Sequence, residues 1–220
     1  MQPHRRRQLA YAALSIADTW FATKGRQRAR LVTKPLLMPA LAAVTAARTQ
    51  APARRATYAA LAGSWVGDIA LMRPGARAFV PGAGAFALGQ TGWLSALAPR
   101  VSPGGWRTTS AKVLATGWAL GAPGVAVKAS MEHPPLGPVL AGYSGALTAV
   151  SAAALNLGPR QPAYARRTAS AGALLFLLSD SLIGLSQFVL ETTDPRWDAA
   201  VMATYTAAQG LLEEGVAHLR

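Results

Sequence analysis

The sequence predicts an all-α polytopic membrane protein, with about eight transmembrane helices in a single domain over residues 1–220. Of the 220 residues, 51 % are hydrophobic and 14 % are charged, which is not the balance of an ordinary soluble domain. The charges gather in short clusters between long uncharged runs, and these runs approach the roughly 20 residues that a spanning helix needs. The chain is therefore expected to lie in a lipid bilayer.

The expected helices are the charge-free runs and the runs that a single aspartate interrupts. Residues 78–99 and 134–159 carry no charge, whereas Asp68 and Asp180 each stand alone in an otherwise uncharged stretch. Pro- and Gly-rich breakers separate the runs and leave no room for a soluble domain. The expected spans are residues 8–23, 33–47, 56–72, 78–98, 111–128, 138–157, 168–190 and 199–217.

The charge balance is strongly basic, with 22 Lys+Arg against 9 Asp+Glu and a formal net charge of +13. In a soluble protein this would suggest a nucleic-acid partner, but clusters that flank apolar runs suit lipid headgroups better, so no nucleic acid is expected. Most basic residues fall on one side if both chain ends are cytoplasmic. The exception is the loop with Lys24, Arg26, Arg28 and Arg30. Ala- and Arg-rich, Lys-poor usage indicates a GC-rich bacterial genome, hence the bacterial cytoplasmic membrane.

The chain offers little for metal or cofactor chemistry. Cysteine is absent and the three histidines are scattered, so no disulfide, thiolate site or local metal motif is expected, and no cofactor is implied. The N-terminus resembles a signal peptide, with a basic stretch before an apolar run. Because Asp18 interrupts that run and no small-residue cleavage site follows, a retained first helix is expected.

A short internal repeat links the third and seventh expected helices. Asp68 follows Arg55 by thirteen residues, and Asp180 follows Arg167 by the same interval. In the next helices, residues 86–90 (FALGQ) resemble residues 205–209 (YTAAQ). These matches suggest two four-helix halves with the same orientation, about residues 8–98 and 111–217; a chance match of short segments is the alternative.

The spacing places both aspartates deep in the bilayer. Thirteen residues of helix lift each one roughly 20 Å from the arginine pair that marks the surface, which is inside the hydrocarbon region. Gly63 with Gly67, and Gly117 with Gly121, form stripes of small residues that are expected to let helices approach closely.

An ionisable residue in the hydrocarbon region is a candidate for function, so Asp68 and Asp180 are the expected catalytic pair. The alternative is that polar partners in the bundle satisfy them. Two carboxyl groups that converge in a low-dielectric cavity cannot both ionise cheaply, so one is expected to keep its proton and the other its charge. The sequence leaves open which is the acid.

Several other polar residues are expected to support the pair. Asp18 is either part of the site or an acid at a helix end, and Lys34 either offsets negative charge or extends to the interface. The remaining polar side chains are expected to supply either substrate contacts or hydrogen bonds between helices. They are Gln90, Asn156, Gln187, Gln209, Tyr143 and Tyr205. Ser179, next to Asp180, is not expected to be a serine nucleophile, because no histidine is near it in the sequence.

Four segments, each on the expected helix and in the expected order, together resemble the YhhN family of lysoplasmalogenases, which are eight-helix membrane enzymes. They are residues 33–36 (TKPL), 67–72 (GDIALM), 176–182 (FLLSDSL) and 204–209 (TYTAAQ). One departure is Gln90, an amide that cannot titrate, where the family often has histidine.

The resemblance implies hydrolysis of the vinyl ether bond of a lysoplasmalogen, which releases a fatty aldehyde and a glycerophospho-alcohol. It implies a lysophospholipid substrate, with Asp68 and Asp180 as acid and carboxylate and with Lys34, Gln90, Tyr205 and Gln209 lining the site. A small proton-coupled transporter and a non-enzymatic membrane scaffold are the alternative functions. The sequence does not identify the physiological lipid or the oligomeric state.

Overall fold

The computed structural model describes residues 3–47, 53–73 and 75–220, and these form an all-helical bundle. Within these ranges there are eight α-helices, two short 3-10 helices and no strand, so the predicted all-α class and the helix count are confirmed. The helices are α1 (Pro3–Thr23), α2 (Gln27–Ala46), α3 (Arg54–Ala70), α4 (Ala76–Leu97), α5 (Thr109–Glu132), α6 (Leu136–Leu155), α7 (Ala163–Phe188) and α8 (Pro195–Ala217).

Every expected span coincides with a helix, but several helices begin earlier than expected. α2 begins at Gln27 rather than at residue 33, and α7 begins at Ala163 rather than at residue 168. The expected bounds stopped at charges, which limit an apolar run but do not prevent backbone hydrogen bonding. Arg28 and Arg30, predicted to lie in a loop, are therefore helical.

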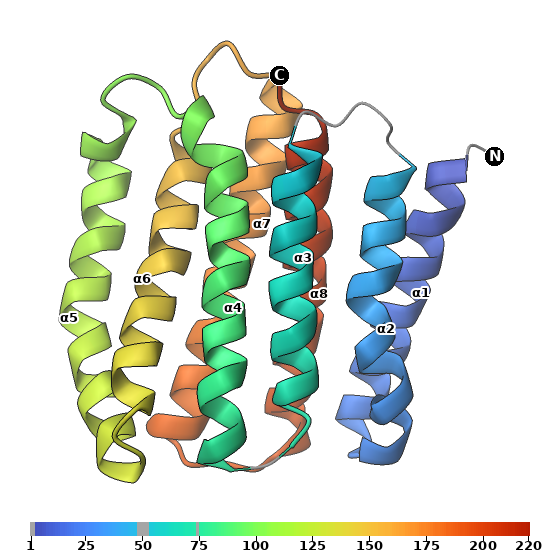
Figure 1. Ribbon diagram of the computed structural model, residues 1–220, viewed down its shortest axis with the longest axis vertical. Coiled ribbons are helices and arrows are strands. Elements are labelled where there is room, and N and C mark those ends of the chain that lie inside the picture. The colour runs from blue at the N-terminus through green and yellow to red at the C-terminus, as the bar shows by residue number, and fades with distance from the viewer. Residues whose placement is uncertain (1–2, 48–52, 74) are drawn as a thin grey trace.

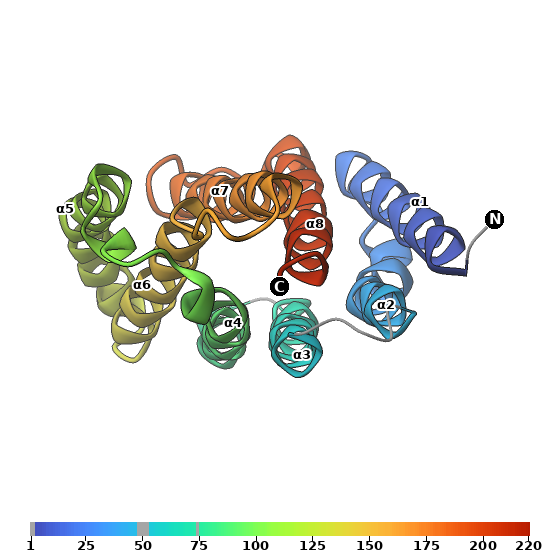
Figure 2. The ribbon, with the colours of Figure 1, turned by 90° about the horizontal axis from the view of Figure 1, so that it is seen from above.

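The eight helices run up and down along one direction, and both chain ends lie at the same end of the bundle (Figure 1). The most extensive contacts join helices that follow one another, α7 with α8, α3 with α4, and α5 with α6; α4 also packs extensively on α6, and α1 on α2. Seen from above, α1 and α2 lie at one side of an elongated bundle and α5 at the other (Figure 2).

Apolar side chains cover much of the outside of the bundle, while several polar side chains lie inside. Ile16, Leu88, Leu120 and Met131 are each more than two-thirds exposed. Two of the described helices, over Leu136–Leu155 and Ala163–Gln187, are long and apolar enough to cross a membrane by length and composition. The buried polar and charged residues include Asp18, Asp68, Gln90, Ser179, Gln209 and Glu213.

The glycine stripe of α3 packs tightly, as predicted. A Cβ placed on Gly63 would lie 2.5 Å from the backbone nitrogen of Gly89, and one on Gly67 would lie 2.5 Å from the Phe86 ring. The same prediction is wrong for α5, because a Cβ on Gly117 or Gly121 would meet no atom within 4 Å. Those two glycines line a cavity instead of a helix contact.

The α3–α4 and α7–α8 pairs share a contact at equivalent positions. Position 60 lies eight residues before Asp68, and Gly172 lies eight before Asp180. A Cβ on Gly89 would lie 3.0 Å from the Ala60 carbonyl oxygen, and one on Gly172 would lie 3.0 Å from that of Ala208. The glycine is on α4 in one pair and on α7 in the other. This contact favours the internal repeat, which stays a prediction.

Two prolines shape α2 where it meets α3. Pro39 has no backbone N–H, so the carbonyl of Pro35, four residues earlier, lacks its helical donor. The indole Nε1 of Trp65 donates to that carbonyl across 2.9 Å. The side chain of α3 thus satisfies an acceptor that the proline leaves free, and it links the two helices beside Lys34.

Candidate active site

One cavity brings the two candidate aspartates together. It has a volume of about 670 Å³, and most of its lining side chains are apolar. Its lining includes both Asp68 from α3 and Asp180 from α7, together with Lys34 from α2, Tyr143 from α6 and Tyr205 from α8. Five different helices therefore place five ionisable side chains around a largely apolar space.

Asp68 is held by a cation and a hydroxyl group. Its carboxylate is 2 % exposed; Lys34 Nζ lies 3.5 Å from Oδ1, and the Tyr205 hydroxyl donates to Oδ2 across 2.8 Å. Behind Tyr205 on the same helix, the side-chain amide of Gln209 donates to the Ser64 hydroxyl across 2.8 Å. Asp68 therefore has a counter-ion and a hydrogen-bond donor despite its burial, as a buried carboxylate needs.

Asp180 has a different environment. The Tyr143 hydroxyl donates to its Oδ2, and the side chain of Gln90 lies next to that hydroxyl. Among the described residues, no basic side chain forms an ion pair with Asp180. The two acids of the cavity thus differ in charge compensation, because only Asp68 is paired with a cation.

Phe86 lies between the two aspartate–tyrosine pairs. Its ring centroid is 5.9 Å from that of Tyr205 and 6.1 Å from that of Tyr143, with the Tyr205 ring nearly perpendicular. Edge-to-face packing of this kind fixes aromatic side chains in position. Phe86, which corresponds to Tyr205 in the predicted repeat, therefore packs against both tyrosines at the cavity.

Lys34 lies within α2 rather than at its start, since the helix begins seven residues earlier. Its side chain is 14 % exposed and reaches Asp68, so the structure favours charge compensation over extension to an interface. Ser179 lines the cavity, but its hydroxyl donates to the Val201 carbonyl across 3.1 Å and so links α7 to α8.

Gln90 and Gln209 do not line the cavity, contrary to the expectation. Both amides are almost fully buried behind the tyrosines, where they contact Tyr143 and Ser64. Their positions in the helix turn them toward neighbouring helices rather than toward the cavity. Of the two roles that the sequence left open for them, the hydrogen bond between side chains is the one observed.

Asp18 does not line the cavity either. It is fully buried between α1 and α2, where Thr33 donates to Oδ1 across 2.5 Å and Arg30 Nε lies 3.5 Å from Oδ2. Arg30 also reaches Asp198 of α8, with Nη1 3.7 Å from Oδ2. Asp18 therefore belongs to an ion-pair network that joins three helices, and not to the site.

Sequence reasoning gave too little weight to Tyr143 and Arg30. Tyr143 was expected only to supply a hydrogen bond somewhere in the spans, and Arg30 was expected in a loop. The sequence around Tyr143 is free of charge and Arg30 lies in a basic cluster, so neither neighbourhood indicated that the partners would be Asp180 and Asp18. One signal could have identified Tyr143. It is a tyrosine within a predicted span, and the next predicted span contains a lone aspartate, Asp180, that needs a hydrogen-bond donor.

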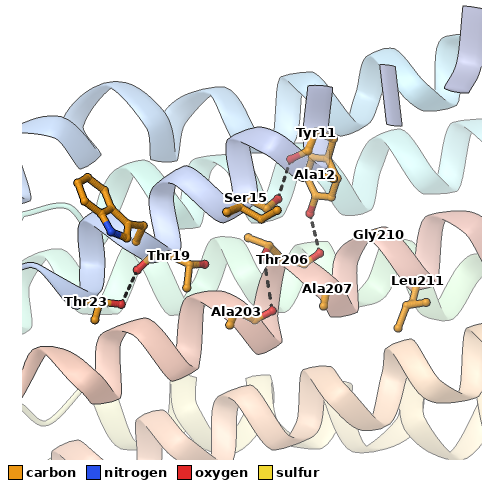
Figure 3. A pocket seen from close by; sticks show the side chains of 12 residues that line it. Tyr11, Ala12, Ser15, Thr19, Thr23, Ala203, Thr206, Ala207, Gly210 and Leu211 are labelled. Atoms are coloured by element: carbon orange, nitrogen blue, oxygen red, sulfur yellow. Dashed lines mark hydrogen bonds between the residues drawn. The ribbon is translucent and has the colours of Figure 1, made fainter. Parts of the chain in front are cut away.

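A second hollow, a groove of about 740 Å³ between α1 and α8, has no carboxylate in its lining (Figure 3). Its hydroxyl groups bond mostly to backbone: Tyr11 donates to the Thr206 carbonyl across 2.7 Å, and Ser15 donates to the Tyr11 carbonyl across 2.9 Å. In the described ranges there is also no group of three or more His, Cys, Asp or Glu side chains that could hold a metal ion. The cavity with both aspartates is therefore the candidate active site.

Comparison with known proteins identifies one family. The model of the YhhN family matches residues 29–216, which include both aspartates and both tyrosines of the cavity. No curated protein and no solved structure matches the chain.

Proposed function

The chain belongs to the YhhN family, and from this premise we propose that it is a membrane-embedded lipid hydrolase. Its proposed substrate is a lysoplasmalogen, whose vinyl ether bond is cleaved to a fatty aldehyde and a glycerophospho-alcohol. The observation that carries the proposal is the pair of aspartates on one largely apolar cavity, of which Asp68 alone has a cation beside it among the described residues.

The chemistry of a vinyl ether needs such a pair. An acid must protonate the β-carbon of the double bond, and the product is an oxocarbenium ion whose positive charge lies at the α-carbon and the ether oxygen. A neighbouring carboxylate stabilises this cation and accepts a proton from the water that attacks it. Glycosidases use two carboxyl groups in a comparable way around an oxocarbenium-like transition state.

The two environments divide these roles. Asp68 is the carboxylate, because Lys34 and Tyr205 both stabilise its negative charge. Asp180 is the acid, because it is half-buried with no cation beside it among the described residues, and two charged carboxylates on one cavity would repel each other. Tyr143 donates to Oδ2 of Asp180, which leaves Oδ1 to carry the transferable proton.

The proton balance closes over one turnover. Asp180 gives its proton to the β-carbon, and Asp68 takes a proton from the attacking water, so a hemiacetal forms at the α-carbon. The hemiacetal then breaks its bond to the glycerol oxygen, which receives the proton from Asp68, while the hydroxyl proton returns to Asp180. One water is consumed, and both aspartates regain their starting states.

A bilayer location supports access of such a lipid to the cavity. Apolar side chains on the outside of the bundle and the two apolar helices α6 and α7 support a location in a membrane. We take this to be a multi-pass arrangement in the bacterial cytoplasmic membrane, as the sequence predicts. The substrate would then reach the site from the lipid phase, with its hydrocarbon chain already in an apolar medium.

The test is aldehyde release by the purified full-length chain in detergent, where no gradient exists, with a vinyl ether lysophospholipid as substrate. We expect release by the unaltered chain and its loss in Asp68→Asn and in Asp180→Asn, whereas Glu132→Gln, an exposed acid at the end of α5, serves as the control. Retained release in either variant would remove that aspartate from the mechanism. No release from the unaltered chain, combined with flux of the intact lipid across sealed vesicles, would instead indicate a transporter.

A further inference from the structure

The cavity also runs along α5. Val113 and Val125, twelve residues apart on α5, both line it, and that separation is about 18 Å of helix. One leaflet of a bilayer has a hydrocarbon depth of about 15 Å, half of the ~30 Å core. The extension is therefore as long as one lipid chain.

Glycines leave this part of the cavity open. Gly117 and Gly121 of α5 and Gly184 of α7 all line it, and a Cβ on any of the three would meet no atom within 4 Å. Glycine inside a helix costs about 1 kcal/mol relative to alanine. At Gly63 a tight helix contact explains the glycine, but no such contact exists at these three positions.

Most of the other side chains around the three glycines are apolar. They come from α5, α6 and α7 and include Leu114, Ala122, Leu147 and Ile183. The polar groups of Trp118 and Ser144 are bonded to each other across 3.0 Å. No charged side chain of the described lining lies on α5, so this part of the cavity suits a hydrocarbon chain and not a headgroup.

We propose that the glycine-lined part of the cavity, formed by Gly117, Gly121 and Gly184, holds the hydrocarbon chain of a single-chain lipid and sets the chain length that the protein accepts. The assignment rests on the proposed function for the identity of the lipid. α5 packs mainly on α6 and only slightly on α7, so the chain lies between α5 and α7 with its ether end toward Asp68 and Asp180.

The test is equilibrium binding of vinyl ether lysophospholipids with short and long chains to the full-length protein in lipid nanodiscs. In Gly121→Leu the new side chain fills part of the cavity that a long chain needs and a short chain does not. Each excluded methylene costs about 0.8 kcal/mol, or about fourfold in Kd. We expect Kd for the long-chain lipid to rise at least about tenfold, and that for the short-chain lipid to change less than about twofold.

Gly124→Leu is the matched control, since Gly124 is on the same helix, has no atom within 4 Å of its Cβ position and does not line the cavity. Gly184→Leu narrows the space from the opposite wall and should reproduce the length dependence if Gly121→Leu does not fold. Equal effects on short and long chains in the variant that folds, or equal effects in the control, would overturn the proposal.

The same measurements separate this inference from the hydrolase proposal. Binding that depends on chain length, without aldehyde release, would support the chain site and contradict the hydrolase proposal. The opposite outcome is aldehyde release at a rate, and with a substrate affinity, that depend neither on chain length nor on Gly121→Leu. That result would support the hydrolase proposal and contradict the chain site.

Discussion

Tyr205 donates its hydroxyl hydrogen to Asp68 across 2.8 Å, although 137 residues separate the two in the chain. Tyr143 makes the corresponding bond to Asp180 from another helix, and Phe86 packs against both tyrosine rings. The two aspartates thus have similar hydrogen-bond donors but different charge partners. This difference is the basis of the roles proposed for them.

Removing either tyrosine hydroxyl should slow the reaction while the fold persists. Tyr205→Phe keeps the ring that packs on Phe86 but removes the donor to Asp68, and Tyr143→Phe does the same at Asp180. Asp68 is charged at rest and Asp180 becomes charged as it gives up its proton, and a hydrogen bond to a charged group contributes about 1.5–3 kcal/mol, so kcat should fall about 10- to 100-fold in each variant. Tyr164→Phe, an exposed tyrosine bonded to Glu214, is the control. Unchanged kcat in both variants would contradict the proposed roles.

Lys34→Met should destabilise the protein and reduce activity together. Breaking one side of a buried ion pair typically costs about 3–5 kcal/mol, because the remaining charge has no partner. The double variant Lys34→Met with Asp68→Asn removes both charges, so its melting temperature should recover while its activity should not. Thermal unfolding and aldehyde release measure the two effects. A double variant less stable than Lys34→Met would show that Asp68 is not the partner of Lys34.

Asp18→Asn should reduce stability without abolishing turnover. Its carboxylate pairs with Arg30 and accepts from Thr33, and it does not line the cavity. We expect a lower melting temperature, by the equivalent of about 3 kcal/mol for a broken buried pair, with kcat within about twofold of the unaltered chain. A loss of kcat without a change in melting temperature would contradict this and indicate that Asp18 takes part in the reaction.

Two glycines on neighbouring helices should respond to alanine in opposite directions. At Gly63 the added Cβ would lie 2.5 Å from backbone atoms of Gly89, so Gly63→Ala should separate α3 from α4 and lower the melting temperature. At Gly84 the added Cβ would meet nothing within 4 Å, and Gly84→Ala should raise the free energy of unfolding by up to about 1 kcal/mol. Equal effects at both positions would contradict the close approach at Gly63.

The helices and the catalytic candidates could be predicted from the sequence because their signals are local. Long charge-free runs predict helices wherever they occur, and a lone aspartate in such a run, as at Asp68 and Asp180, stands out against its neighbours. The starts of α2 and α7 were predicted too late because the prediction relied on the same local signal. A charge marks where an apolar run stops, and the helix continues past it.

Partners across the bundle are a different matter, because they depend on how helices rotate and pack. The sequence by itself determined the all-α class and the eight helices, and it identified Asp68 and Asp180 as candidates. Only the tertiary structure decided that Lys34 pairs with Asp68, that Arg30 pairs with Asp18, and which glycines face a neighbour or a cavity. A rotation of one helix changes all of its contacts without changing its hydrophobic pattern, so the pattern carries no record of them.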